Sequence, residues 1–263
     1  MSEDGARRPW TSPSRLATFR ECARKYRFQH VEKLPTRPSP HMDLGSNVHA
    51  ALRDWFRLPR SQRTWERMLE LYRAAWRANM PAFRTRSRDE LRAFGERGKA
   101  MLQRFVEETP AETEPIAIEK WVGLDFGDLE VKGKVDRVDL LPDGTLRVVD
   151  YKTGKFPRDP GRVQADDLAA VVYAAGASRD FVGAPVGAIE YLYLGSGERI
   201  AFPVDEAWRG ERERAVGSLA RTVRAAEAAD AFPATPTPRC AWCDFVRRCA
   251  EGQAFLDAHG ARR

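Results

Sequence analysis

The chain has 263 residues, of which 43% are hydrophobic and 10% aromatic, so it can bury the core of one elaborated domain or of two small ones. Its 44 basic and 38 acidic residues give a formal net charge of +6, which favours an anionic partner, although much of this charge is ordinary solvated surface. No apolar run approaches the ~18 residues of a membrane span, and the N-terminus, MSEDGARRPW, lacks an apolar signal region, so we expect a cytoplasmic protein.

The first helix is expected to open at Ser12. The Ser12 side chain can cap the helix, and Pro13 suits the first helical position. Cys22 lies among apolar residues that recur at helical spacing: Leu16, Phe19, Ala23 and Tyr26.

A second helix is expected to begin near Ser46 or Asn47 and to extend toward Leu58. It carries His49 in the pattern G-x-x-x-H-x-x-L. A lone histidine on a helix is more often packed or at the surface than a ligand, so His49 needs support from elsewhere in the chain.

Residues Ser61 to Glu108 are predicted to be helical, and their aromatic side chains are expected to lie mainly in the core. The basic residues in this part either line a channel for a nucleic-acid strand or form an exposed link between helices: Arg84, Arg86, Arg88 and Arg92.

The first strand of a sheet is predicted from Ile116 to Val122, IAIEKWV, and contains Glu119. An ion pair of Glu119 with Lys132 or Lys134 competes with a functional role for this residue.

A β-hairpin is predicted from Glu130 to Lys155, with its turn at Pro142-Asp143-Gly144. Proline presets φ for a type I turn, and glycine takes the left-handed position that closes a three-residue loop with a bulge. This loop would place Asp136 opposite Asp150 on one face of the sheet, with Lys152 on the same face. A two-residue loop would send the two aspartates to opposite faces.

Two opposed carboxylates repel each other unless a cation lies between them. A hard divalent ion suits oxygen ligands, and the neighbouring Lys152 can orient or deprotonate a water molecule bound to it. The alternative is that Asp136, Asp150 and Lys152 are solvated charges at a frayed end of the sheet.

After this hairpin we expect a helix from about Asp166 to Ala177, which contains Tyr173. Another hairpin is expected at residues 187–194 and 198–204, followed by a long helix that Asp205 caps, at residues 206–229.

The chain has four cysteines, and three of them are clustered as C-x-x-C-x(5)-C near the C-terminus. A cytoplasmic chain does not ordinarily form disulphides, so this spacing favours a metal site. Three clustered thiolates leave one ligand missing, and Cys22 is the remaining candidate beside Cys240, Cys243 and Cys249. Spacing alone allows either zinc or a [4Fe-4S] cluster.

The motif D-x(13)-D-Y-K-T-G, formed by Asp136 and residues 150–154, resembles the active-site signature of the PD-(D/E)xK nuclease superfamily, in particular its RecB-type branch. This resemblance implies that the two aspartates bind Mg²⁺ or Mn²⁺ and that Lys152 assists the attack of water on a DNA phosphodiester.

Other positions match the same family. The resemblance implies that His49 is a further metal ligand and that Glu119 is the acidic residue common before the hairpin. Tyr173 matches the tyrosine of a Q-x-x-x-Y helix that contacts DNA and the active site. The place of its glutamine is taken by Ala169, and Gln164 is out of register.

The cysteine pattern is similar to the iron-sulphur staple of the AddB-type and CRISPR-adaptation nucleases. This resemblance implies a structural [4Fe-4S] cluster held by Cys22, Cys240, Cys243 and Cys249, rather than zinc. The cluster would join the N-terminal and C-terminal parts of the domain.

We therefore expect an α/β fold, with a restriction-endonuclease-like core whose mixed central sheet is flanked by helices. Residues 1–263 are expected to form a single nuclease domain. Its predicted parts are the first-cysteine and histidine helices (12–58), a helical elaboration (60–108), the sheet and active-site core (116–204), and the C-terminal helix with the cysteine triplet (205–263).

The expected activity is metal-dependent DNA cleavage, as an exonuclease on single strands or ends in repair or recombination. The sequence has no helicase-type phosphate loop, so a separate helicase or repair protein is the expected partner. Two alternatives remain: an iron-sulphur module that binds DNA with little turnover, and a zinc-stapled structural domain that acts on something other than nucleic acid.

Overall fold

The computed structural model describes residues 9–37, 40–79, 87–110, 112–127, 129–161, 163 and 167–260. The chain forms two compact units, of which unit 1 comprises Met1–Arg37, Gly123–Gly133 and Ala207–Arg263, and unit 2 comprises Pro38–Val122 and Lys134–Glu206. The single nuclease domain stays a prediction.

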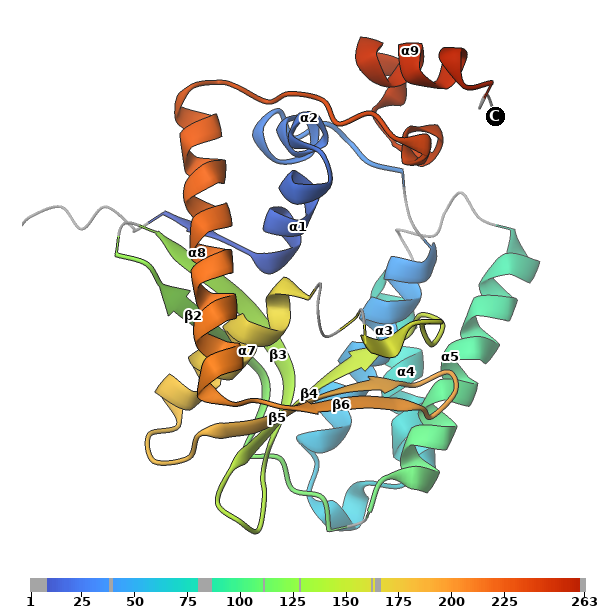
Figure 1. The fold of residues 1–263 in the computed structure, drawn as a ribbon. Coiled ribbons are helices and arrows are strands. Elements are labelled where there is room, and N and C mark those ends of the chain that lie inside the picture. The colour runs from blue at the N-terminus through green and yellow to red at the C-terminus, as the bar shows by residue number, and fades with distance from the viewer. Residues whose placement is uncertain are drawn as a thin grey trace, which may run out of the picture. The chain divides into compact units, whose positions relative to one another are not determined.

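Unit 2 is built on a mixed sheet, which Figure 1 shows edge-on beside its helices. The strands are β2 (Ala117–Asp125), which belongs to unit 2 up to Val122, β3 (Glu130–Leu140), which belongs to it from Lys134, and β4 (Leu146–Lys152), β5 (Val186–Tyr193) and β6 (Arg199–Pro203). Strands β3 to β6 follow one another across the sheet, and β2 pairs with β3. The β3–β4 and β5–β6 pairs are antiparallel, whereas β4 and β5 are parallel. The predicted mixed sheet is thus confirmed.

A parallel strand pair needs a crossover connection, and α7 (Leu168–Asp180) provides it between β4 and β5. The helix packs on both strands. Its small, closely packed side chains, including Ala170, Ala174 and Ala177, are fully buried.

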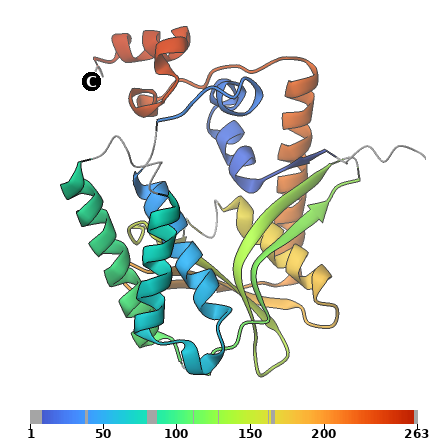
Figure 2. The same cartoon turned by 180° about the vertical axis from the view of Figure 1, so that it is seen from behind.

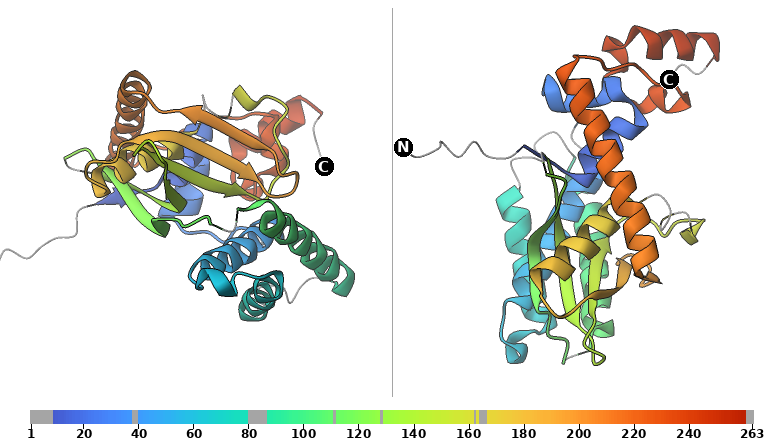
Figure 3. Two further views of the ribbon diagram at one scale, coloured as in Figure 1. Left: turned by 90° about the horizontal axis from the view of Figure 1, so that it is seen from below. Right: turned by 60° about the vertical axis from the view of Figure 1, so that its left-hand side comes forward.

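Three helices pack together against the sheet of unit 2: α3 (Pro40–Phe56), α4 (Trp65–Asn79) and α5 (Arg88–Glu108). They stand side by side in Figure 2, and the left panel of Figure 3 shows them on one side of the sheet. Their shared core takes in Val149 and Tyr151 of β4. Because side chains alternate along a strand, Val148 and Asp150 point to the opposite face.

Two of the predicted helices in unit 2 have different bounds. Helix α3 begins at Pro40 rather than near Ser46, since proline suits the first helical turn and Asp43 follows in that turn. The segment predicted as helical up to Glu108 also contains the 3₁₀ turn η2 (Arg60–Gln62), and Ser87 opens α5 with a capping box. Arg84 and Arg86 of the basic cluster lie outside the described residues.

Unit 1 contains the short strand β1 (Trp10–Thr11), which runs parallel to the start of β3. Its helices are α1 (Pro13–Glu21), α2 (Ala23–Tyr26), the π-helix η1 (Arg27–Val31), α8 (Glu206–Ala228), the 3₁₀ turns η4 (Pro238–Trp242) and η5 (Val246–Arg248), and α9 (Ala250–Ala258). The first residue of α8, Glu206, still belongs to unit 2. Ser12 caps α1 as predicted, because its Oγ accepts a hydrogen bond from the Arg15 amide at 3.3 Å.

The first helix is interrupted where the sequence predicts continuity. Cys22 has extended backbone, with φ −165° and ψ 115°, and separates α1 from α2. None of the helices in the described part of the chain has both the length and the apolar character that crossing a membrane requires.

Candidate metal-dependent active site

The turn of the central hairpin has the predicted three-residue form. Gly144 has a φ of +81°, the left-handed conformation that glycine adopts without a steric penalty. Its amide donates to the Leu141 carbonyl at 2.9 Å, and the Leu141 amide donates to the Thr145 carbonyl at 2.8 Å. The register that follows pairs Arg137 with Val149. The predicted register is therefore confirmed up to this pair.

Asp136 and Asp150 come one residue further out on the two strands. The Asp136 carboxylate is fixed in place because its Oδ2 accepts a hydrogen bond from the Tyr151 amide at 2.8 Å. Its Oδ1 remains directed toward a histidine from another element.

His49 of α3 is that histidine, with its Nδ1 3.0 Å from Asp136 Oδ1. Its Nε2 lies 3.1 Å from the Tyr151 carbonyl oxygen, which only accepts, so Nε2 carries a proton. Burial lowers the pKa of His49, but the hydrogen bond and charge of Asp136, with the charges of Asp150 and Glu119, raise it above its ordinary value. These contacts favour the charged ring more than water does, and deprotonation at Nδ1 leaves a ligand nitrogen beside Asp136.

Glu119 completes a group of three possible metal ligands with His49 and Asp136, whose ligand atoms all lie within 4.8 Å of one another. Glu119 lies in β2 with a φ of +51°, a conformation that is strained for a residue with a β-carbon. Its Oε2 also forms an ion pair with Lys134, so the predicted alternative partner of Glu119 is present in the structure as well.

Asp150 and Lys152 form a close ion pair on β4, with 2.9 Å between Lys152 Nζ and Asp150 Oδ2. Burial raises the pKa of Asp150 to about 6, against the lowering effect of Lys152 and with a further increase from Asp136. Burial lowers the pKa of Lys152, yet Asp150 and Asp167 raise it above its ordinary value. The lysine therefore stays charged near neutral pH, and its ammonium lies 4.8 Å from the centre of the Tyr191 ring.

Helix α7 brings Tyr173 toward these groups. Burial raises the pKa of Tyr173, and the charges of Asp150 and Asp136 raise it further. Gln164 lies outside the described residues, and Ala169 offers no side-chain amide in the expected position.

Asp167 is a candidate site residue that the sequence analysis did not single out. It caps α7 by accepting from the Ala169 amide at 2.6 Å, and its second oxygen accepts from the Tyr191 hydroxyl at 2.6 Å. An aspartate directly before an apolar helical run is an N-cap signal, which would have identified its position but not its contact with Tyr191.

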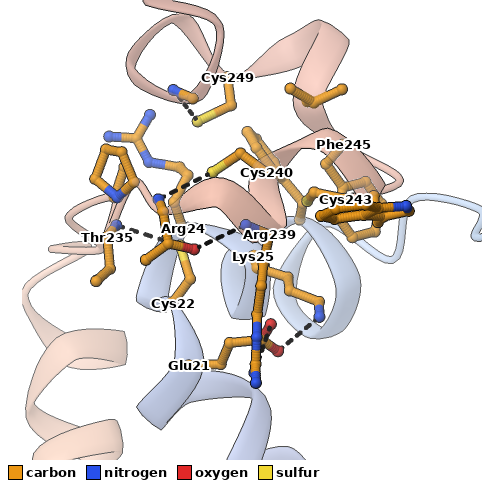
Figure 4. A pocket seen from close by; sticks show the side chains of 17 residues that line it. Glu21, Cys22, Arg24, Lys25, Thr235, Arg239, Cys240, Cys243, Phe245 and Cys249 are labelled. Carbon is orange, nitrogen blue, oxygen red and sulfur yellow. Dashed lines mark hydrogen bonds and ion pairs between the residues drawn. The ribbon is translucent and has the colours of Figure 1, made fainter. Parts of the chain in front are cut away.

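The four cysteines lie together in unit 1. They line one cavity of about 300 Å³, which Figure 4 shows with Cys22 contributed from between α1 and α2 and the other three from the C-terminal segment. The Cys22 Sγ also makes a contact with a residue far along the chain, because it accepts a hydrogen bond from the Thr235 amide at 3.4 Å.

Each cysteine sulphur has a backbone amide donor. The Thr237 amide lies 3.5 Å from the sulphur of Cys240, and the Gly252 amide lies 3.4 Å from that of Cys249. Burial raises the pKa of Cys243, while a backbone hydrogen bond from Phe245 lowers it. Amide hydrogen bonds of this kind favour thiolates, the form in which cysteine binds metals.

The cysteine sulphurs are not arranged as four ligands of one zinc ion would be. Four thiolates around one zinc ion lie about 3.8 Å apart, given Zn–S bonds of about 2.3 Å and tetrahedral angles. Among the described residues, which include all four cysteines, no three sulphurs lie within 4.8 Å of one another. The spacing is wider than a single zinc ion requires.

Comparisons with known proteins identify the family and the fold of the chain. The family model of the PD-(D/E)XK nuclease superfamily matches residues 11–250. A solved structure from Eubacterium rectale, described as a "Putative exonuclease", has 14% sequence identity and a TM-score of 0.61, with 94% of this chain and 92% of that chain covered. The structure of SSO0001 also has 14% identity and covers 96% of this chain and 89% of that chain, but its TM-score of 0.41 is too low to support an argument. No curated protein matches the sequence. The chain belongs to the PD-(D/E)XK nuclease superfamily.

Proposed function

We propose that the chain is an Mg²⁺- or Mn²⁺-dependent deoxyribonuclease that hydrolyses phosphodiester bonds as an exonuclease on single-stranded DNA or DNA ends. The observation that carries this proposal is the group formed by His49, Glu119 and Asp136, beside the ion pair of Asp150 and Lys152. Exonuclease action also takes support from the description of the Eubacterium rectale protein. A role in repair or recombination and a separate helicase partner are part of the proposal.

The donor set fits a hard divalent cation. Two ligands of one Mg²⁺ lie at most about 4.2 Å apart, given bonds of about 2.1 Å, and the three side chains need only small rotations to meet this limit. The bond from His49 Nε2 to the Tyr151 carbonyl fixes the tautomer that presents Nδ1, as outer partners of metal-bound histidines commonly do. We propose Asp150 as a further ligand on the side of Lys152.

The divalent ion would polarise the phosphodiester and make water a better nucleophile. Asp136 and Glu119 hold the negative charge that positions such an ion. Lys152 keeps its proton, so its ammonium orients the attacking water as a donor and stabilises charge that develops on phosphate oxygens, rather than accepting a proton. Tyr173 lies within the field of the same carboxylates and is proposed to contact the substrate.

The test is cleavage of end-labelled single-stranded and duplex DNA by anaerobically purified protein with Mg²⁺, Mn²⁺ or EDTA. Wild type should cut with either metal and not with EDTA. Asp136→Asn should lose cleavage by at least about a thousandfold and still fold, since the amide oxygen can accept from the Tyr151 N–H. If wild type binds DNA but does not cut under any of these conditions, a DNA-binding module replaces the nuclease.

We also propose that Cys22, Cys240, Cys243 and Cys249 hold a [4Fe-4S] cluster with a structural role. The cavity that all four cysteines line and the backbone amides that point at their sulphurs support a site for thiolate-bound metal, and the resemblance of the cysteine pattern favours iron over zinc. Anaerobically purified protein should contain about four iron atoms and absorb near ~400 nm. Colourless protein with one zinc ion would contradict it.

A further inference from the structure

We infer that Lys134 exchanges partners: it pairs with Glu119 in the metal-free protein and binds a backbone phosphate of the nucleic acid, next to the phosphate to be cleaved, once Glu119 binds a divalent cation. This inference rests on the proposed nuclease function. It assigns Lys134 to substrate binding and explains why Glu119 has features of both a metal ligand and an ion-pair partner.

The position of Lys134 places its ammonium at the edge of the site. Lys134 lies two residues before Asp136 on β3, so the two side chains point to the same face of the strand. The Lys134 side chain is 43% exposed, whereas that of Glu119 is only 11% exposed. The lysine therefore reaches from solvent to a nearly buried carboxylate.

Glu119 cannot give its full charge both to this lysine and to a metal ion. A divalent ion between Glu119, His49 and Asp136 withdraws charge from the same carboxylate that attracts Lys134, so the ion pair weakens when the metal binds. Conversely, the ion pair of Lys134 with Glu119 lowers the affinity of this group for the metal ion. Lys134 and the metal ion are thus competitors for Glu119.

A second cation near Glu119 is held more firmly. Arg53 lies one helical turn after His49, and its guanidinium donates two hydrogen bonds to Asp54, at 2.7 and 2.8 Å. The bond to Asp54 raises the pKa of Arg53, and the charge of Glu119 contributes to the same shift. Because both bonds of the Arg53 fork are to Asp54, and the Lys134 pair is the one that shares Glu119 with the metal group, we assign the exchange to Lys134.

The chemistry of the lysine indicates which part of the substrate it binds. An ammonium on a flexible four-carbon stem acts as a point charge toward phosphate, without the fixed geometry that reads a base. We therefore expect a contact that is independent of nucleotide sequence and sensitive to salt.

The first measurement is the Mn²⁺ affinity of the full chain by titration calorimetry. Lys134→Met should bind Mn²⁺ about two- to fivefold more tightly, because a partly exposed ion pair no longer competes for Glu119. Lys134→Arg should stay close to wild type. The control is Lys120→Met, which removes the same charge next to Glu119 in sequence, but from a lysine paired with Asp180 at 3.3 Å.

The second measurement is binding of a labelled single-stranded oligonucleotide with Ca²⁺ across a range of salt concentrations, with gels to check that the strand stays intact. Lys134→Met should bind more weakly, and the slope of log K against log salt should fall by about 0.7, the value for one phosphate contact on a single strand. Lys120→Met should leave this slope unchanged.

An exchange of partners makes Lys134→Met bind Mn²⁺ more tightly and the oligonucleotide more weakly. A merely structural role for Lys134 would weaken the binding of Mn²⁺ and of the oligonucleotide alike. The inference is wrong if Lys134→Met binds Mn²⁺ no more tightly than Lys120→Met does, or if its salt slope equals that of wild type. If wild type cleaves DNA with Mn²⁺ but Lys134→Met changes neither the Mn²⁺ affinity nor the salt slope, the partner exchange is wrong and the proposed nuclease function still holds. Where wild type neither binds Mn²⁺ nor cleaves, the proposed function falls and the inference falls with it.

Discussion

Replacing Lys152 by methionine should destabilise the protein in a pH-dependent way. Asp150 is only 8% exposed, and its carboxylate lies 2.9 Å from the Lys152 ammonium. Burial keeps the pKa of Asp150 near 6 even with this partner present. Lys152→Met leaves the carboxylate buried without its closest cation, so the pKa of Asp150 should rise further.

The size of the effect follows from the exposure of the two side chains. Removing one partner of a fully buried ion pair costs about 3–5 kcal/mol. The Lys152 side chain is 33% exposed, so water and counterions reach the site, and we expect a loss of about 2 kcal/mol near neutral pH. For a chain of this size, such a loss lowers the melting temperature by about 4–8 °C.

The sign of the pH dependence is fixed by the direction of the shift. A carboxyl with a raised pKa binds more protons in the folded than in the unfolded protein, so its ionisation removes stability as the pH rises from about 4 through the folded pKa. The deficit of Lys152→Met relative to wild type should therefore be small near pH 5 and full near pH 8.

The assay is urea unfolding of metal-free wild type, Lys152→Met and Asp150→Asn/Lys152→Met at both pH values. The double variant has no buried carboxylate to leave unpaired, so it should regain most of the lost stability. An equal deficit at both pH values, or a double variant no more stable than the single one, would refute the argument.

Three further predictions concern other residues. Mn²⁺ affinity should fall as the pH decreases from about 8 to 6, because the metal must displace a proton from His49, whose pKa is raised. Calorimetry in buffers of different ionisation enthalpy should detect about one proton released on binding. An added Cβ meets nothing within 4 Å at Gly144 or at Gly95, so backbone conformation decides both substitutions. Gly144→Ala should cost about 1 kcal/mol in thermal unfolding because the φ of Gly144 is +81°, whereas Gly95→Ala should stabilise the protein by about the same amount because alanine favours the helical conformation of α5. Arg63→Met should cost about 3 kcal/mol in urea unfolding, because the Arg63 side chain is only 6% exposed, pairs with Glu114 and donates to three backbone carbonyls. Arg60 also pairs with Glu114, but its side chain is 53% exposed, so Arg60→Met should cost below about 1 kcal/mol.

Local chemistry made the hairpin predictable. The turn sequence ending in Gly144 fixes the loop length, and the loop length fixes which residues of β3 and β4 face each other. The cap at Ser12 and the helix after Asp205 were predictable for the same reason, because the signal lies within a few residues of the element that it starts.

Contacts between distant segments were not predictable in this way. Cys22 separates α1 from α2, and its sulphur accepts from an amide more than two hundred residues later, a contact that nothing near Cys22 in the sequence marks. The left-handed backbone at Glu119 lies inside β2, whose glycine, Gly123, comes four residues later, so no residue at that position signals it. Family resemblance pointed to Glu119 and His49. The tautomer and hydrogen bonds of His49 and the ion pair of Glu119 with Lys134 depend on tertiary structure.

The site itself is tested most directly by locating Mn²⁺ with anomalous diffraction from crystals soaked in MnCl₂ near neutral pH. We expect one strong peak within bonding distance, about 2.0–2.3 Å, of His49 Nδ1, a Glu119 oxygen and an Asp136 oxygen, with the Lys134 ammonium moved away from Glu119. A peak at other residues, or a fully occupied peak that leaves His49 bonded only to Asp136 and Tyr151, would contradict it.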